Sequence, residues 1–297
     1  MKRAGCLFLA IAPVATLVVY LLGPDPDAGG PDDRPSASQG SDALADETQR
    51  ELEERIRKMP AGLAAKDKKE LAQKLVSSAE NSTLDWRANY GYIEDIGDGN
   101  GYTAGIIGFC SGTHDMLELV ERYTEEHPDN GLAEYLPALR AVDGTDSHEG
   151  LDGFPEAWEQ EAKKPEFRAA QDEMRDDEYF EPAVRQAKMD GLSTLGQFIY
   201  YDAMVLHGPG TAPNGFYGIR ERAMEKARTK AEGGKEEAYL KAFLDVRREV
   251  MKAEKPGRRH GDTSRIDTAQ RAFLEAGNFA LDTPLEWKVY GDPYRVK

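Results

Sequence analysis

The stretch "EDIGDGNGYTAGIIG", from Glu94 to Gly108, places glycines next to carboxylates and then continues with apolar residues. Glycine reaches backbone conformations that other residues avoid, so this segment is predicted to turn sharply beside negative charge. Three kinds of site need that combination. They are a dinucleotide-binding turn, a calcium-binding loop, and a tight turn that presents a catalytic carboxylate.

The first two kinds of site do not fit the sequence. Gly99–Ala104 formally matches G-x-G-x-x-A, but a Rossmann turn needs a buried strand before it and a helix after it. Here charged residues precede the turn and β-prone residues follow it. A calcium loop beginning at Asp95 has Ile106 where a bidentate glutamate is required, and one beginning at Asp98 has Phe109 there.

The third kind of site, a turn that presents a carboxylate, is retained. Glu80 is expected near the end of a helix that closes between Glu80 and Ser82, and Asp98 lies at the tip of the turn shortly afterwards. Two carboxyl groups that face each other across a groove are the apparatus of glycoside hydrolysis: one protonates the leaving oxygen while the other activates water or attacks. Spacing alone is weak support, because the chain contains 54 acidic residues.

Apolar residues recur mostly at helical spacing, which predicts a mainly α fold with one small β-hairpin. A capping box is expected at Asp67, and Thr113 is expected to cap the helix that follows it. Further helices are predicted at Phe167–Asp190, Leu192–Leu206, Glu236–Glu254 and Ser264–Ala276, and strands only at Tyr90–Ile96 and Tyr102–Phe109. The segment "LSTLGQFIYYDAMVL" is apolar nearly all round, as in a central buried helix.

The net charge of −16 disfavours nucleic acids and anionic membranes as partners. It suits a cationic substrate, although acidity that only keeps the protein soluble would look the same. Cys110 is the one cysteine outside the apolar N-terminus and is interpreted as a small buried hydrophobe rather than a nucleophile. The histidines show no metal-binding spacing, so neither a metal nor another cofactor is expected, and the protein is expected to be a monomer.

The N-terminus predicts export. Lys2 and Arg3 precede an uncharged run over residues 4–22, which is typical of a signal peptide but is also long enough for a signal anchor. We expect a signal peptide or anchor over residues 1–22, a disordered linker over 23–45, a charged helical extension over 46–59 and a catalytic domain over 60–297. Either form of the N-terminus places the domain outside the cell.

Long segments resemble the family 46 chitosanases. The resemblance is carried by "LVSSAENSTLDWRANYGYIEDIGDGNGYTAGIIGFCSGTHDMLELV", "YFEPAVRQAKMDGLSTLGQFIYYDAMVLHGPG" and "DTSRIDTAQRAFLEAGN", and it extends from about Pro60 to the C-terminus. It implies a secreted, inverting endo-hydrolase of partly deacetylated chitosan. The implied fold is lysozyme-like, two-lobed and mostly helical, with a small sheet lining the cleft.

The resemblance also implies roles for individual residues. Glu80 becomes the general acid, Asp98 the general base, and Thr103 the residue that holds the attacking water. A supporting ion network consists of Asp202, Arg247 and Arg265, although a purely structural salt bridge would use the same residues. Substrate-binding positions are Asp115, Tyr92, Asn100, Thr113, Tyr179 and His207. Asn100 departs from the family, whose members often carry arginine there.

Other functions remain open at this level. A muramidase uses the same scaffold, but peptidoglycan is polyanionic and an acidic protein would be repelled by it. A chitosan-binding surface protein without catalysis is the non-enzymatic alternative, and the presence of Glu80, Asp98 and Thr103 together speaks against it. The tryptophans, Trp86, Trp158 and Trp287, are interpreted as packing residues, and a role as platforms for sugar rings is the less favoured alternative.

Overall fold

The computed structural model describes residues 50–253 and 261–297, and the chain divides into the units Met1–Met59 and Pro60–Lys297. In the first unit, residues 50–58 form a helix within the expected helical extension. The expected signal segment and linker lie outside the described residues. Within the described ranges, no helix combines the length and apolar character that crossing a membrane requires.

The unit Pro60–Lys297 is mainly helical, as predicted. Its α-helices are α2 Lys66–Glu80, α3 Asp115–Glu126, α4 Leu136–Val142, α5 Phe154–Glu161, α6 Pro165–Arg175, α7 Glu181–Met189, α8 Thr194–His207, α9 Phe216–Lys226, α10 Glu236–Ala253 and α11 Arg271–Glu275. Short 3₁₀ helices occupy Gly62–Ala64, Trp86–Gly91 and Ala133–Tyr135, and π-helical turns occupy Asp176–Phe180 and Arg265–Gln270.

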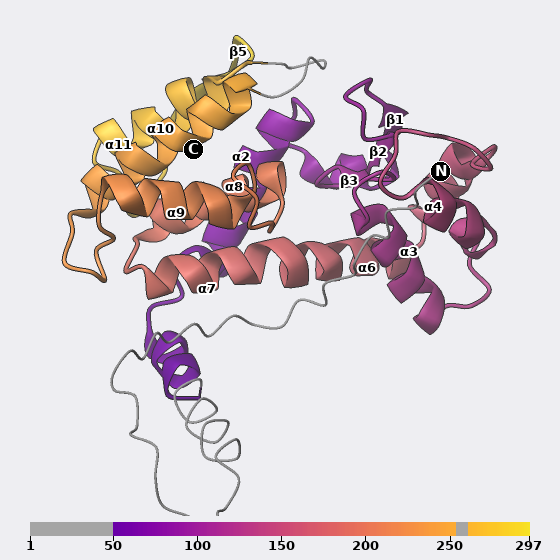
Figure 1. The fold of residues 1–297 in the computed structure, drawn as a ribbon, viewed down its shortest axis with the longest axis horizontal. Helices are drawn as coiled ribbons and strands as arrows, with labels where there is room; N and C mark the ends of the chain where they lie inside the picture. The colour runs from indigo at the N-terminus through magenta and orange to yellow at the C-terminus, as the bar shows by residue number, and fades with distance from the viewer. Residues whose placement is uncertain (1–49, 254–260) are drawn as a thin grey trace, which may run out of the picture. The chain divides into compact units, whose positions relative to one another are not determined.

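Within this unit the helices form two groups (Figure 1). Helices α8 to α11 gather at one end, and α3 and α4 lie with the small sheet at the other. Helices α6 and α7, joined by the π-helical turn Asp176–Phe180, run between the two groups. This is the mainly α, two-lobed arrangement that the sequence predicted.

The small sheet has three antiparallel strands, β1 Ile93–Asp95, β2 Tyr102–Ala104 and β3 Phe109–Cys110, in the order β1-β2-β3. Glu94 pairs with Thr103, and Thr103 pairs with Cys110. The predicted hairpin of two longer strands is therefore wrong in extent. The glycines at 105 and 108, both with positive φ, break the second predicted strand so that its end folds back as β3.

Other local expectations also needed correction. Helix α2 ends at Glu80 as predicted, but it begins at Lys66 after an Ala65 that offers no side-chain cap, so the capping box at Asp67 is absent. Asp67 instead lies in the first turn, where its negative charge interacts favourably with the positive end of the helix dipole. Thr113 does not cap α3, because the N-cap residue is His114 with φ of 77°. Helices α4, α5 and α9 and the hairpin β4 Leu285–Val289 with β5 Asp292–Val296 were not predicted.

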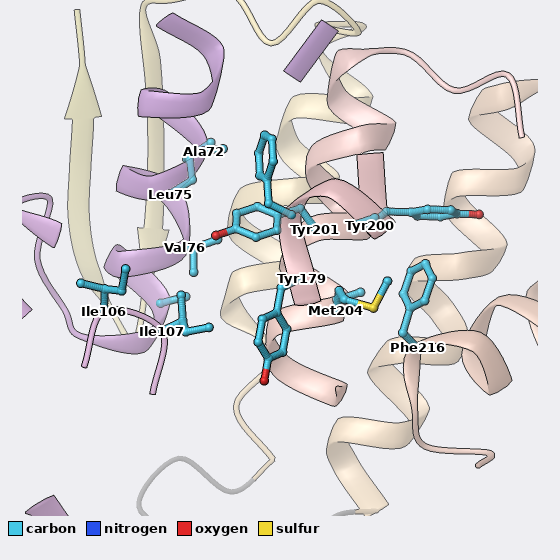
Figure 2. Packing of buried hydrophobic residues seen from close by; sticks show 14 of the residues in the cluster. Ala72, Leu75, Val76, Ile106, Ile107, Tyr179, Tyr200, Tyr201, Met204 and Phe216 are labelled. Atoms are coloured by element: carbon cyan, nitrogen blue, oxygen red, sulfur yellow. The ribbon is translucent and has the colours of Figure 1, made fainter. Parts of the chain in front are cut away.

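Helix α8 is the centre of the core, as its apolar sequence predicted. Tyr200 and Tyr201 are adjacent in α8 and point in opposite directions (Figure 2). The Tyr201 hydroxyl donates to Gln73 of α2 at 2.9 Å, whereas the Tyr200 hydroxyl donates to Asp190 at 2.7 Å and its ring packs on Phe216. Helix α8 therefore fixes α2 on one side and the α7–α9 region on the other.

The tryptophans pack in this core. Trp86, Trp158 and Trp287 are all buried, and the indole nitrogens of the last two donate to the Tyr90 carbonyl and the Ser78 hydroxyl. Their ring faces are therefore not available as platforms for a sugar.

Gly112 allows a close backbone approach that supports the turn containing Asp98. Its N–H donates to the Asn100 carbonyl at 2.9 Å. A Cβ at this position would lie 2.1 Å from the Thr145 carbonyl oxygen and 2.9 Å from that of Asn100. Both neighbours are backbone atoms, so neither can rotate away.

We expect Gly112→Ala to lower the free energy of unfolding by about 1–3 kcal/mol, because the added methyl group overpacks a backbone contact. Gly210→Ala is the matched control, since its Cβ would come no closer than 4.0 Å to another atom. Chemical denaturation of both variants measures the difference. Equal stability of the two variants would contradict the proposed contact.

Candidate active site

Glu80 is the last residue of α2, and an arginine from a distant part of the chain holds its side chain. Arg265 Nη2 lies 2.7 Å from Glu80 Oε1, and the Glu80 side chain is 21% exposed. The same Nη2 lies 2.8 Å from Asp202 Oδ1. A single guanidinium nitrogen therefore connects a solvent-accessible carboxylate with a fully buried one.

The predicted network of Asp202, Arg247 and Arg265 is assembled in the structure. Arg247 Nη2 donates to Asp202 Oδ2 at 3.0 Å, and all three side chains are buried. Gln270, which was not predicted, donates to Asp202 at 2.5 Å and accepts from Arg247 at 2.9 Å. Arg265 and Gln270 are the first and last residues of one π-helical turn. A helical pattern in the sequence gave no sign that both would reach the same carboxylate.

Burial alone would raise the pKa of Asp202, because it disfavours the charged form. The positive charges of Arg265 and Arg247 and the hydrogen bonds from Arg265 and Gln270 outweigh burial and hold the pKa below its usual value. Asp202 is therefore ionised at neutral pH. A buried charge of this kind is tolerated only because every oxygen has a partner.

His207 extends this network. It is the last residue of α8, and its Nε2 accepts a hydrogen bond of 3.4 Å from Arg247 Nε. His207 was expected to line the substrate groove, and in the structure its side chain contacts the buried Arg247.

Asp98 is presented by the glycine-rich turn between β1 and β2. Gly97, Gly99 and Gly101 all have positive φ, between 71° and 87°, which explains why the turn needs glycine at alternate positions. Asn100 holds both carboxylate oxygens of Asp98. Its backbone N–H donates to Oδ1 at 3.0 Å and its side-chain amide donates to Oδ2 at 3.2 Å.

Thr103 lies in β2 between two polar cross-strand neighbours. Its hydroxyl is 3.4 Å from Cys110 Sγ, and Glu94 is its partner on the other side. Residues directly opposite each other in a sheet share a face, so Glu94 stands beside Thr103. Tyr92 donates its hydroxyl to Glu94 at 3.0 Å. Glu94 was not singled out from the sequence, although its place across the predicted hairpin was a usable signal.

Cys110 is half-buried rather than fully enclosed. Burial raises the pKa of its thiol to about 12, with the nearby Asp115 charge adding to the effect. The thiol is therefore neutral near pH 7, which agrees with the interpretation that it is no nucleophile.

Three predicted substrate-binding residues form one cluster at the start of α3. Asp115 Oδ1 accepts from the Thr113 hydroxyl at 2.8 Å and from the Cys110 N–H at 3.0 Å. Asp115 Oδ2 accepts from the Tyr179 hydroxyl at 3.1 Å. Burial raises the pKa of Asp115 and these hydrogen bonds oppose that rise, while burial and the Asp115 charge raise the pKa of Tyr179 well above its usual value.

A cavity of about 960 Å³ opens beside the Asp98 turn. Asp98 and Asn100 line one side of it, and residues of α8, α9, α10 and the connection between α8 and α9 line the rest. The turn that carries Asp98 and the helices α8, α9 and α10 therefore line one space. Among the residues that the structure describes, no cluster of His, Cys, Asp and Glu could hold a metal ion.

Asp202→Asn should lower the free energy of unfolding by about 3 kcal/mol at neutral pH, because it leaves two buried arginines without their carboxylate. The folded pKa of Asp202 is lower than the value near 3.9 of the unfolded chain. The stabilisation is therefore complete above that value and is lost as the pH falls through it towards the folded pKa.

Denaturation curves at about pH 7 and about pH 3 test this expectation, since the difference between wild type and variant should shrink at the lower pH. Asp245→Asn is the control, because Asp245 pairs with Arg271 but has a side chain that is 59% exposed. It should cost less than about 1 kcal/mol at either pH. An Asp202 variant as stable as the control would contradict a structural role for the network.

Known proteins resemble this chain in sequence and in fold. Residues 74–285 match the sequence profile of glycosyl hydrolase family 46. A chitosanase of Streptomyces sp. (strain N174) is 61% identical over 240 residues, which is 80% of this chain and 85% of that protein.

Solved structures agree with the sequence comparison. A chitosanase co-crystallised with substrate superposes with a TM-score of 0.78 at 55% identity, covering 80% of this chain and 100% of the other. The family 46 chitosanase of Gynuella sunshinyii in complex with chitotetraose gives a TM-score of 0.72 at 33% identity, covering 81% and 99%. The chain therefore belongs to glycosyl hydrolase family 46.

Proposed function

We propose that this protein is an endo-acting chitosanase that cleaves β-1,4 bonds in partly deacetylated chitosan with inversion at the anomeric carbon. The observation that carries the proposal is the position of Asp98, whose two oxygens are held by Asn100 at the wall of a cavity large enough for sugar units. Family membership and the chitosan oligomers bound by relatives support the same substrate.

In the proposed reaction Glu80 is the general acid. It donates its proton to the glycosidic oxygen as the bond from that oxygen to the anomeric carbon breaks. Arg265 keeps the Glu80 carboxyl oriented, and Asp202 neutralises one of the two arginine charges, so the buried network holds Glu80 in position.

Asp98 is the proposed general base. It removes a proton from a water molecule whose oxygen attacks the anomeric carbon from the face opposite the leaving group, and the Thr103 hydroxyl helps hold that water. An inverting reaction requires room for the water, which corresponds to carboxyl groups about 6.5–9.5 Å apart. Glu94, beside Thr103 on the same face of the sheet, adds a second carboxylate near the water position.

The substrate is cationic where it is deacetylated, which fits the acidic residues of the site. Asp115 is the proposed partner of a glucosamine ammonium group, with Thr113 and Tyr179 fixing its carboxylate. Tyr92 and His207 are proposed to complete the groove. The charge of −16 would attract chitosan and repel peptidoglycan. We further propose that residues 1–22 direct the enzyme out of the cell, where polymeric chitosan is found.

Glu80→Gln and Asp98→Asn should each lower kcat on chitosan by at least about 100-fold, since each removes one proton-transfer group. Release of new reducing ends measures the rate, with chitin and peptidoglycan as alternative substrates. Glu134→Gln is the control, because Glu134 is exposed and lies outside the site. NMR of the first products should show the α-anomer.

Full activity in either variant would remove that residue from its role, and a β-anomeric first product would exclude inversion. A folded wild type that binds chitosan without releasing ends would support the non-enzymatic alternative. Preferential release from peptidoglycan would support the muramidase.

Asn100 provides a separate test of Asp98 as the base. Asn100→Asp places a second carboxylate against Asp98, and like charges raise the pKa of one of the pair. The acidic limb of the pH dependence of kcat/KM should then move to higher pH. Asn100→Ala removes the amide hydrogen bond to Asp98 without adding charge, so it should lower kcat and move that limb to higher pH by less than Asn100→Asp does. Identical pH profiles for wild type and Asn100→Asp would show that Asp98 does not set the acidic limb.

A further inference from the structure

The turn that carries Asp98 is bounded by two residues that pair across the sheet. Asp95 ends β1, Tyr102 begins β2, and the two lie opposite each other in the register. A Cβ at Gly97 or Gly99 would meet no atom of the described residues within 4 Å, so the tip of the turn has little packing of its own. The position of Asp98 therefore depends on how firmly the two ends of the turn are held.

One side chain contacts both ends of this turn. His148 belongs to the connection between α4 and α5, residues 143–153. Its ring stacks on that of Tyr102, with ring centroids 4.1 Å apart and planes inclined by 22°. Its Nε2 lies 3.6 Å from Asp95 Oδ2, while Asp95 Oδ1 accepts from the Gly97 N–H at 2.8 Å. The Asp95 carboxylate therefore links His148 to the backbone of the turn.

The connection that bears His148 is itself fixed. The Leu151 N–H donates to the His148 carbonyl at 3.0 Å, and the Leu151 side chain is buried. The Thr145 hydroxyl accepts from the Ser147 N–H at 3.2 Å, and the Thr145 carbonyl packs against Gly112. His148 is therefore held in place from its own side of the contact.

The contact between His148 and Asp95 depends on charge. A separation of 3.6 Å is too long for a hydrogen bond, and His148 Nε2 is shielded from solvent and forms no hydrogen bond to the residues that the structure describes. A neutral imidazole would gain little from the carboxylate, whereas an imidazolium would form an ion pair with it. Histidine changes its charge between about pH 5 and about pH 8, while aspartate stays ionised down to about pH 4. The turn is therefore held most firmly in mildly acidic solution.

The other charged groups around this contact are mostly carboxylates. Burial raises the pKa of the Tyr102 hydroxyl, and the charges of Asp95, Asp152 and Glu156 add to the effect, so Tyr102 stays neutral. The titratable groups of the neighbouring elements are Asp95 of β1, Asp146, Glu149 and Asp152 of the connection, Glu156 of α5, and Asp143, which pairs with His114 at 2.8 Å. A positive charge on the His148 ring would thus meet negative charge from several elements.

We infer that His148 is a positioning residue for the proposed base. In its protonated form it holds both ends of the turn and so keeps Asp98 where a water molecule can be activated. His148 acts through Asp95 and Tyr102 and not on the substrate itself. This inference rests on the proposed function and adds to it a residue that makes the reaction depend on pH.

The test is the pH dependence of the rate of His148→Phe, which keeps a ring for stacking but cannot take up a proton. Reducing ends released from short glucosamine oligomers by the full chain give kcat between about pH 5 and about pH 8. The substrate amines titrate equally for every enzyme, so the ratio of wild-type to variant kcat removes their contribution. That ratio should be on the order of threefold at the acidic end, as a partly exposed ion pair would give, and should approach one at the alkaline end. A ratio that is the same at every pH would overturn the inference.

Asp95→Asn assigns the effect to the ion pair. Its amide oxygen can still accept from the Gly97 N–H, but the charge is lost, so this variant alone should give the same pH-dependent ratio. Adding His148→Phe to it should cause no further loss in acid. His127→Phe is the matched control, because His127 follows α3 and its ring contacts Tyr123 with centroids 5.0 Å apart. A further acid loss in the double variant, or the same profile in the control, would contradict the assignment.

The activity of the wild type separates this inference from the proposed function. If the wild type releases no ends from the oligomers or from chitosan at any pH, the proposed function fails and the role of His148 fails with it. If the wild type is active and the ratio stays flat, only the role of His148 fails. If His148→Phe does not fold, Asp95→Asn decides the question by the same ratio.

Discussion

The ion pair from Arg265 to Glu80 and Asp202 is the interaction on which the packing around α8 and the position of the proposed acid depend. Asp202 lies in α8, the most apolar helix among the residues that the structure describes, where an unpaired charge would be very costly. Its partners come from α10 and from the π-helical turn before α11, so those elements must pack against α8 before the charge is balanced. One of those partners also reaches Glu80 at the end of α2. The packing of the core therefore also orients the proposed acid.

The proposed base is positioned by a different device. Asp98 lies on a turn with little side-chain packing of its own, and its geometry comes from backbone contacts and from Asn100. Gly112 and Ser111 secure this turn, because the Gly112 N–H donates to the Asn100 carbonyl and the Ser111 hydroxyl accepts from the Tyr102 N–H. The acid is therefore held by buried charge and the base by a hydrogen-bonded turn. A water-activating group on a turn can adjust to the sugar, whereas the acid remains fixed to the core.

The sequence predicted the helical class, the end of α2 at Glu80 and the burial of α8 because periodicity and apolar content are local properties. It also predicted the approach of Asp202, Arg247 and Arg265, but only through resemblance to a family. Local patterns could not predict Gln270 as a partner of Asp202, because that contact depends on the pitch of a helix. They also missed β4 and β5, whose pairing depends on the connecting turn and on burial of Trp287 against Phe273. The false cap at Asp67 came from a motif that lies two positions after the true N-cap, Ala65.

The π-helical turn Arg265–Gln270 has a further consequence for how this family can vary. In an α-helix, side chains five positions apart point in directions that differ by roughly 140°. A π-helical turn closes hydrogen bonds between residues five apart, which brings its first and last side chains onto one face. Arg265 and Gln270 meet at Asp202 for this reason. The five-residue spacing therefore places both side chains on one face only while the turn is π-helical. A gain or loss of one residue within this turn would separate Arg265 from Gln270, although every amino acid of the network would still be present in the chain.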